Sequence, residues 1–403
     1  MRVKKCLGLG FGLITTLGFS ATALSSGIDT AIKDGTVNGN IRAYYNTRDF
    51  ETKTNETAFS FGGALRAETG SLGMFKFGVG YYTAQDLDTN DSDLAKVNKR
   101  LGSQVEVLGE AYVTASFTDT DASIGRIKLN TPFANGGDAF VIPFTFEGGS
   151  LINKSVENLT IQFNHINSIK NRNSDEFVDV GAWSTNRYGV GVTSTSGTTM
   201  LGAIHSADGI KLQAWAYNYA DLFTSLYFQG NYSFAAMGEI KPFMAAQLVS
   251  QSGTGDELLG NVDSTLFGLQ GGAGFGKSKL TFAYTTVAEE TGAFKNGAFL
   301  TPYSFSTSPI FTNNMLVTME NVDAGDAIKL TYNYSFTKVK LKVSYAEFDF
   351  ETADDREALD VDVTYSLNEM VKGLSARYRL ESVTSDTDSV EQINNRFQLQ
   401  LKY

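Results

Sequence analysis

A short alternation of apolar and polar residues recurs along almost the whole chain and limits the folds it can adopt. In the stretch 39–50, GNIRAYYNTRDF, one set of alternate positions includes Ile41 and Ala43, and the other includes Arg42 and Arg48. Successive side chains of a β-strand point to opposite faces, so this strand has one apolar face and one face with two guanidinium groups. The rest of the sequence indicates whether that polar face meets bulk water or an enclosed interior.

Eighteen segments of about ten residues show the same alternation. Such segments are the signature of a transmembrane β-barrel, whose apolar faces meet lipid and whose polar faces meet the lumen. Bacterial barrels of this kind have an even number of strands. We therefore expect an all-β fold, a transmembrane antiparallel β-barrel of about 18 strands over residues 37–403. The expected strands are 39–50, 57–68, 73–84, 105–117, 122–130, 145–154, 159–169, 199–207, 210–219, 222–234, 238–250, 264–276, 279–288, 325–337, 338–350, 357–367, 373–383 and 394–403.

The connections between these segments alternate between short and long. Short periplasmic turns and long outer loops are typical of such barrels, whereas a solenoid or stacked sandwiches would not give this parity. Short turns are expected at Gly70-Ser71, Asp119–Asp121, Val156–Asn158, Asp208-Gly209, Lys277-Ser278 and Thr337-Lys338, and long loops at 85–104, 131–144, 170–198, 251–263, 289–324 and 384–393. The chain ends NRFQLQLKY, an amphipathic strand with an aromatic last residue, which looks like the signal that the barrel-assembly machinery recognises.

The N-terminus has the form of a secretory signal peptide. A basic start, Met1–Lys5, precedes the apolar run Cys6–Phe19 and the small-residue site Ala21–Ala23. We expect residues 1–23 to be removed on export, and the only cysteine with them. Residues 24–36 are then a short periplasmic segment, in which 27–35 is expected to form an amphipathic helix. No later run is long and apolar enough for a membrane helix, which needs about 20 residues.

Assigning the polar face of each strand to the lumen gives an interior rich in cations, although the net charge of the chain is −11. A channel lined by one sign of charge concentrates solutes of the opposite sign, and arginine binds a carboxylate in bidentate fashion. The alternative is a purely structural role, in which these bases pair with inward acids and stabilise the wall. The expected pore-lining bases are Arg42, Arg48, Arg66, Lys76, Arg126, Lys128, Arg377 and Arg379, with Lys329, Lys340, Lys342, Arg396 and Lys402 also on inward faces. The inward acids are Glu68, Glu106, Glu110, Asp360, Asp362 and Glu381.

The stretch NTPFANGGDAFVIPFTF, residues 130–146, is the best candidate for a constriction. It holds two of the five prolines, a glycine pair and several aromatic residues, and a loop 131–144 folded into the lumen must satisfy its backbone against protein or water. A second candidate is 299–312, which carries hydroxyl groups and two more prolines. Ordinary surface loops remain the alternative for both. The residues expected at the constriction are Asn130, Thr131, Pro132, Phe133, Asp138, Pro143 and Phe144.

The order of IRAYYNTRDF (41–50), GRIKLNTPFANGGDAFVIPFTFEG (125–148), IKNRNSDEF (169–177) and LSARYRLE (374–381) resembles the OprD family of outer-membrane porins. The resemblance implies an eighteen-stranded, substrate-selective channel for small, often carboxylated solutes. It also implies a ladder of basic residues through an eyelet formed partly by the third and seventh loops. By motif, Arg42 and Arg48 correspond to the first-strand arginines of that ladder, and Arg126 and Lys128 come just before the inward loop.

Two motifs are set aside. The stretch GGAGFGKS, 271–278, fits the phosphate-loop pattern, but that chemistry needs a following helix, and the next residues alternate as a strand. The chain has only two histidines, His165 and His205, with no nucleophile that would complete a catalytic group. We therefore expect no enzyme activity, no cofactor and no metal.

The sequence predicts a porin of the Gram-negative outer membrane for passive diffusion of small hydrophilic solutes, with anionic or carboxylated solutes favoured. Its expected partners are small anionic or zwitterionic solutes, outer-membrane lipid and the assembly machinery, with no nucleic acid, because the chain is acidic. Two alternatives stay open, a general, weakly selective porin and a barrel that acts mainly in surface structure or adhesion. The sequence leaves the preferred solute, the pore radius and the oligomeric state open, a homo-oligomer included.

Overall fold

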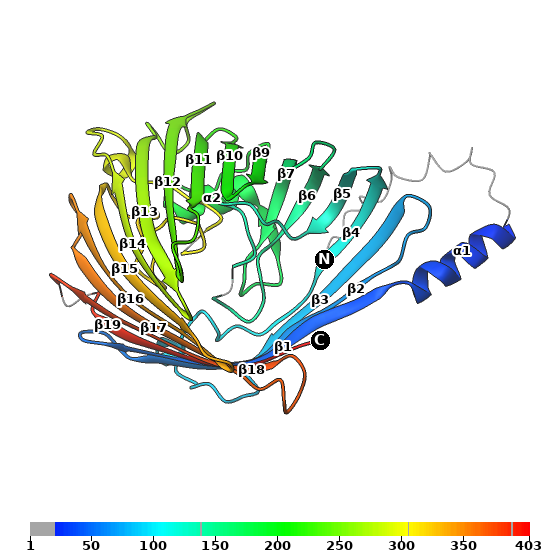
Figure 1. Ribbon diagram of the computed structural model, residues 1–403, viewed down its shortest axis with the longest axis horizontal. Helices are drawn as coiled ribbons and strands as arrows, with labels where there is room; N and C mark the ends of the chain where they lie inside the picture. The colour runs from blue at the N-terminus through cyan, green and yellow to red at the C-terminus, as the bar shows by residue number, and fades with distance from the viewer. Residues whose placement is uncertain (1–20, 138, 305, 388–389) are drawn as a thin grey trace, which may run out of the picture.

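The computed structural model describes residues 21–137, 139–304, 306–387 and 390–403. In this part of the chain, nineteen strands form one antiparallel sheet that closes on itself, because β1 pairs with both β2 and β19 (Figure 1). Eighteen of them make the wall. The other, β8, has three residues and pairs only with the upper end of β7. The predicted all-β barrel of eighteen wall strands is confirmed.

The wall strands follow one another around the barrel in chain order. Their bounds are β1 Thr36–Phe50, β2 Glu56–Glu68, β3 Phe75–Gln85, β4 Val105–Phe117, β5 Thr120–Ile127, β6 Thr145–Asn153, β7 Leu159–Lys170, β9 Thr198–Ala207, β10 Ile210–Tyr219, β11 Phe223–Ser233, β12 Ile240–Gly253, β13 Asp263–Phe275, β14 Ser278–Val287, β15 Gly325–Ser335, β16 Val339–Phe350, β17 Arg356–Ser366, β18 Leu374–Ser385 and β19 Gln392–Lys402. Each overlaps one predicted strand, and most boundaries shift by one to three residues.

The elements that alternation did not predict lie in the long connections. These are β8 (Phe177–Asp179), α2 (Val180–Arg187) and the 3₁₀ turns η1 (Leu94–Lys96) and η2 (Phe294–Gly297). Three or four residues are too few to show a period. The eight residues of α2 follow the N-cap residue Asp179, whose side chain accepts a hydrogen bond from the backbone N–H of Ala182 at 2.9 Å.

The two faces of the wall differ as a membrane barrel requires. Large apolar side chains are exposed on the outward face; Leu65, Val79 and Leu201, for example, are 50%, 50% and 53% exposed. A water-soluble protein does not expose apolar side chains over such an area, whereas a lipid-facing wall does. The alternate residues are buried inside the barrel, as Tyr44 and Tyr82 are at 0% exposure. No helix of the described residues has the length and apolar character to cross a membrane.

The helix α1 (Ala21–Lys33) lies at the short-turn end of the barrel and leads into β1 (Figure 1). The backbone N–H of Gly70, in the turn after β2, donates to the carbonyl of Ala31 at 2.7 Å. The helix predicted over 27–35 falls largely within α1. Of the expected signal peptide, residues 1–20 lie outside the described residues.

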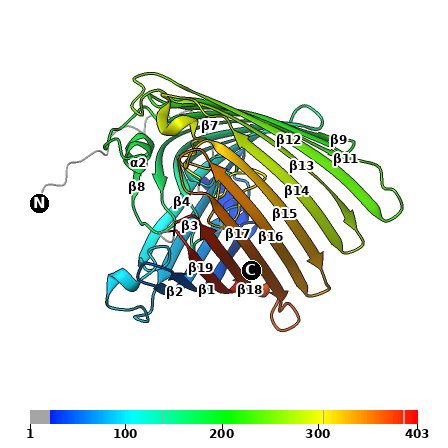
Figure 2. The same ribbon diagram turned by 90° about the vertical axis from the view of Figure 1, so that its left-hand side faces the viewer.

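Two long connections enter the barrel instead of leaving it. Loop 3 (128–144, without residue 138) joins β5 to β6, and loop 7 (288–324, without residue 305) joins β14 to β15. Their buried residues share one apolar cluster with the inward faces of β10 and β11, to which loop 3 contributes Phe133 and loop 7 contributes Phe299. The yellow trace of loop 7 can be followed within the ring of strands in Figure 2. These loops occupy part of the interior that the wall encloses.

Candidate solute path through the barrel

An aromatic cluster on β10 and β11 fixes one end of loop 3. Phe133 is fully buried, and the centre of its ring lies 5.1 Å from those of Tyr217 and Tyr227 and 5.3 Å from that of Phe299. The backbone N–H of Phe133 donates to the Tyr217 hydroxyl at 3.2 Å. Trp215, Tyr217 and Tyr219 form a stack along β10 with centroids 6.0 Å apart. Aromatic rings bury much area in fixed geometries, so this cluster holds the loop firmly.

The other end of loop 3 reaches the opposite side of the barrel. Arg42 on β1 donates through Nη1 to the carbonyl of Phe140 at 2.6 Å, and the Tyr44 hydroxyl donates to the carbonyl of Ala139 at 3.3 Å. Lys170, at the end of β7, donates through Nζ to the carbonyl of Pro143 at 3.0 Å. Backbone groups of loop 3 are thus satisfied by inward side chains of the wall, as a lumenal loop requires.

The residues expected at the constriction take different places in loop 3. Thr131 is buried and closes a tight turn, since its hydroxyl donates to the carbonyl of Ala134 at 3.0 Å. Phe133 and Phe144 are buried anchors, at 0% and 1% exposure. Asn130, Pro132 and Pro143 complete the same stretch, and Asp138 lies outside the described residues.

Loop 7 crosses from β12 to β17 and β18. The side chain of Gln247 on β12 donates to the carbonyl of Pro309 at 3.2 Å and accepts from the N–H of Phe311 at 3.1 Å. On the far side, Asp360 accepts from the N–H of Met315 at 3.1 Å, and Glu381 accepts from the N–H of Leu316 at 2.9 Å. The inward acids of β17 and β18 therefore hold the loop.

A buried carboxylate organises the loop 7 residues between these anchors. Glu320 is 1% exposed and accepts hydrogen bonds from Thr301 at 3.1 Å, from the N–H of Ser306 at 3.1 Å and from Asn313 Nδ2 at 2.6 Å. The hydroxyl of Ser308 also donates to it. A charge with this many donors is well compensated, and the segment 301–313 folds around it.

The two loops leave a cavity of about 400 Å³ against the wall, which we call the eyelet cavity. Neutral polar and small residues of the loops line one side, and bases of β16, β18 and β19 line the other. The loop residues are Asn135, Gly137, Ala139, Ser306, Thr307, Asn313, Asn314 and Met315, and the wall residues are Lys342, Asp360, Arg377, Arg379 and Arg396.

A second cavity of about 330 Å³ adjoins the first, since Ala139 and Met315 line both. We call it the vestibule cavity, since residues of the long loops 2 (86–104) and 4 (171–197) form most of it. It is lined by Arg48, Glu56, Asn98, Lys99, Arg100, Ala139, Phe140, Phe144, Asn171, Arg172, Asn173, Trp183, Arg187 and Met315. Among their described lining residues both cavities hold more bases than acids, and we call the two adjoining cavities together the passage.

Several of the expected pore bases lie on inward faces beside acids. Arg377 donates to Asp362 through Nε at 2.9 Å, and Nε of Arg379 lies 3.4 Å from the same carboxylate. Arg66 contacts Glu110 at 2.6 Å, and Arg48 contacts Glu56 at 3.4 Å.

Two further expected bases, Arg42 on β1 and Lys76 on β3, also lie on inward faces. Arg42 donates through Nε to Gln400 Oε1 at 3.0 Å. Lys76 shares the inward parity of β3 with Gly78 and Gly80, nearer the short-turn end.

Arg126 differs from expectation. It pairs across the sheet with Ala111, which pairs with the lipid-facing Val79, so its register places it on the outward face. There it contacts Glu147 at 2.8 Å and stacks over Phe177 at 4.3 Å. Lys128, which was expected to line the pore together with Arg126, follows the end of β5 and lies beside Gly136 of loop 3.

The apolar interior beside the end of β5 explains why Arg126 faces outward. Ile127 and Leu129, the apolar neighbours of Arg126 and Lys128, are 5% and 4% exposed and pack into the interior cluster with Phe133. The rule that apolar residues face lipid therefore fails at the top of β5.

The sequence interpretation missed the arginines of the long loops. Arg100 in loop 2 and Arg172 and Arg187 in loop 4 line the vestibule cavity. Burial, and then the positive charge of Arg187, lowers the pKa of the Arg172 guanidinium, yet an arginine stays charged at neutral pH. Loops show no period, so only the spacing Lys170-Asn171-Arg172 directly after a predicted strand could have pointed to it.

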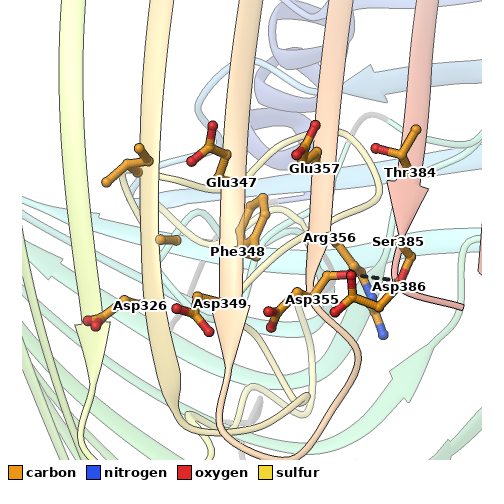
Figure 3. A pocket seen from close by; sticks show the side chains of 12 residues that line it. Asp326, Glu347, Phe348, Asp349, Asp355, Arg356, Glu357, Thr384, Ser385 and Asp386 are labelled. Atoms are coloured by element: carbon orange, nitrogen blue, oxygen red, sulfur yellow. Dashed lines mark hydrogen bonds between the residues drawn. The ribbon is translucent and has the colours of Figure 1, made fainter.

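A further cavity, of about 490 Å³, lies on the outward side of β15 to β18 near the long loops and is acidic. Figure 3 shows Asp326, Glu347, Asp349 and Glu357 along neighbouring strands. Asp326 pairs with Asp349, and Glu347 pairs with Glu357. This surface faces away from the passage and takes no part in it.

Comparison with known proteins identifies the family. The sequence profile described as outer membrane porin, OprD family, matches residues 30–403. Among curated protein sequences, none matches this chain.

Solved structures share the fold at low sequence identity. Acinetobacter baumannii OccAB3 has a TM-score of 0.80 and 17% identity, covering 92% of this chain and 100% of that chain. Pseudomonas aeruginosa OccK9 (OpdG) has a TM-score of 0.78 and 20% identity over 93% and 100% of the two chains. Pseudomonas aeruginosa OpdK, solved with vanillate, has a TM-score of 0.77 and 16% identity over 92% and 99%. With a barrel of the same architecture and a profile match over nearly its whole length, the chain belongs to the OprD family of outer membrane porins, and its place is the outer membrane of a Gram-negative cell.

Proposed function

We propose that this porin favours small anionic solutes, carboxylates above all, and that the bases of the eyelet cavity select them. The observation that carries the proposal is the composition of that cavity. Among its described lining residues, four bases stand against one acid: Lys342, Arg377, Arg379 and Arg396 against Asp360. All of these come from the wall, and the facing loop residues that the structure describes are neutral.

The enclosure of these charges strengthens their effect on a solute. A narrow passage with low-dielectric walls focuses the field of its charged groups and raises the local concentration of counter-charged solutes. A guanidinium presents a planar fork that matches a carboxylate, and a sequence of such groups lets a solute move from one to the next. Selection of this kind needs binding weak enough for release.

The loop side of the eyelet cavity complements this arrangement. Asn135, Thr307 and Asn314 offer amide and hydroxyl groups opposite the bases. A solute with its carboxylate toward the wall would present its remaining polar groups to these side chains. The neighbour OpdK was crystallised with vanillate, a small carboxylated molecule, which is consistent with this class of solute.

A general porin with slight ionic preference is the second candidate, and the ion pairs of the wall favour it. Asp362 contacts both Arg377 and Arg379, and Glu110 contacts Arg66. Bases neutralised in this way brace the wall and contribute less to the field.

The salt-gradient reversal potential in a planar bilayer separates the two candidates. We expect the protein to favour anions and the variants Arg42→Ala, Arg48→Ala and Arg379→Gln each to shift the potential toward cations. The variant Lys277→Gln, in an exposed short turn, serves as the control for loss of one charge. A large conductance with no ionic preference, unchanged in the three variants, would establish the general porin instead.

A further inference from the structure

The vestibule cavity contains a buried arginine held in place with free donor atoms. Arg172 is 6% exposed, and its guanidinium carbon lies 4.3 Å from the centre of the Phe140 ring and 4.5 Å from that of Phe144. Its Nε and Nη1 atoms have no hydrogen-bond partner among the described residues. Two aromatic rings thus fix the orientation of the guanidinium while two of its N–H groups stay available.

The eyelet cavity holds a second arginine of the same kind. Arg396 on β19 is fully buried, and its Nη1 has no hydrogen-bond partner in the described part of the chain. Buried donors of folded proteins are normally satisfied by protein, water or a ligand. The passage therefore holds two buried guanidinium groups, one in each cavity, with unsaturated donors.

The two sites lie in neighbouring cavities. Ala139 and Met315 line both, so the cavities adjoin each other. Arg172 itself reaches the boundary, because its Nη1 would lie 2.9 Å from a Cβ atom added at Gly137, which lines the eyelet cavity. After burial, the positive charges of Arg187 and then of Arg396 lower the pKa of Arg172, so both groups lie within electrostatic range of it.

The balance of charge sets the class of solute. Arg100, above the ring of Phe140 at 5.5 Å, adds another guanidinium with an unpartnered Nη1 to the vestibule. The one carboxylate among the described vestibule residues, Glu56, already contacts Arg48. A single monoanionic group supplies one charge and can contact Arg172 or Arg396, but not both.

We propose that Arg172 and its neighbours in the vestibule cavity form a second anion site, and that the passage selects small solutes with two negative groups, such as dicarboxylates. One group binds at Arg172 while the other binds at Arg396. Once the first group is bound, the second contact is intramolecular and gains from a high effective concentration. The inference rests on the proposed anion preference and extends it from one charge to two.

The test compares succinate with succinamate, which has the same carbon chain but one carboxylate replaced by a neutral amide. Blocking of single-channel current in a planar bilayer gives the affinity of each. We expect succinate to bind about tenfold more tightly, the effect of one charge-assisted contact. In Arg172→Gln the preference should fall to about twofold or less, with the succinamate affinity changed less than about threefold.

Arg172→Lys keeps the positive charge but lacks the planar guanidinium, so its preference for succinate should lie between those of the unaltered protein and Arg172→Gln. If Arg172→Gln fails to fold, Arg172→Lys takes its place in the test. Lys277→Gln should keep the full preference. Equal affinities for the two probes in the unaltered protein, or a preference that survives Arg172→Gln, would overturn the inference. The reversal potential in a salt gradient, measured on the same channels, tests the proposed anion preference separately. A channel that favours anions but does not prefer succinate would reject the second anion site and leave the proposed anion preference standing.

Discussion

Arg379 on β18 and Arg396 on β19 lie directly opposite each other across the strand pair, both facing the eyelet cavity. Like charges in directly opposite positions destabilise a sheet, and an interior position gives them little screening by water. The direct pairing of the two arginines across the strands therefore costs stability. Both arginines line the eyelet cavity, and we propose that they serve its anion preference.

The variant Arg396→Gln should therefore separate selectivity from stability. We expect the anion preference to fall, because a base of the eyelet is removed. Relief of the repulsion from Arg379, of about 0.2–1 kcal/mol, should offset the lost contacts of Arg396 in the free energy of unfolding. Urea unfolding and the reversal potential measure the two effects. A large loss of stability with unchanged selectivity would show that Arg396 is a bracing residue.

Phe133 should control how tightly loop 3 is held. Phe133→Ala removes a fully buried ring and its contacts with Tyr217, Tyr227 and Phe299, a change that typically costs about 3–5 kcal/mol locally. We expect larger and noisier single-channel currents, because the loop detaches from β10 and β11. Phe267→Ala is the matched control, since Phe267 lies on the outward face. Currents as quiet as those of the unaltered protein would contradict this role.

Asp323 should make the attachment of loop 7 depend on pH. Burial alone would raise its pKa, but hydrogen bonds from the Thr352 hydroxyl and from the backbone N–H groups of Thr352, Ala324 and Ala353 outweigh that effect and lower it. A carboxyl whose pKa is lower in the folded state than in the unfolded state stabilises the fold at pH values above its unfolded-state pKa. This stabilisation is lost as the pH falls through the folded-state pKa.

We therefore expect steady currents from neutral pH down to about pH 4, the ordinary pKa of an aspartate, and more frequent closures below it. Asp323→Asn should show the frequent closures already at neutral pH, with a weaker dependence on pH. Single-channel recording between pH 7 and pH 3 measures both. Closures that respond to pH equally in the two proteins would assign the effect to other groups.

Arg126 tests the register of the wall. Its side chain pairs with Glu147 on the outward face, so Arg126→Gln should leave the reversal potential unchanged, whereas Arg379→Gln shifts it. Both variants lose one guanidinium, which makes them a matched pair. An equal shift in the two would place Arg126 on the solute path.

The sequence predicts the wall well and the interior only in part. Each wall strand has lipid on one side, so its alternation is regular and could be recognised, as for 39–50. At the top of β5 the interior itself is apolar, because Ile127 and Leu129 pack under loop 3, and there the same rule misplaced Arg126. Loops 3 and 7 were found through their prolines and aromatic residues.

The vestibule arginines could not be predicted in the same way. Arg100 and Arg172 come from loops with no period, and what brings them together is packing against Phe140. Arg100, Phe140 and Arg172 are far apart in the sequence, and only the folded loops show that these residues line one cavity.

We propose that solutes pass between loop 7 and the basic wall of the eyelet cavity, and the variant Thr307→Cys tests this path most directly. Thr307 lines the eyelet cavity opposite the arginines. We would measure how fast a negatively charged and a positively charged methanethiosulfonate reagent modify this cysteine and reduce the current. The prediction is a strong block by both reagents, with the anionic reagent reacting about tenfold faster because the wall concentrates it. No block, or faster reaction of the cationic reagent, would contradict the claim.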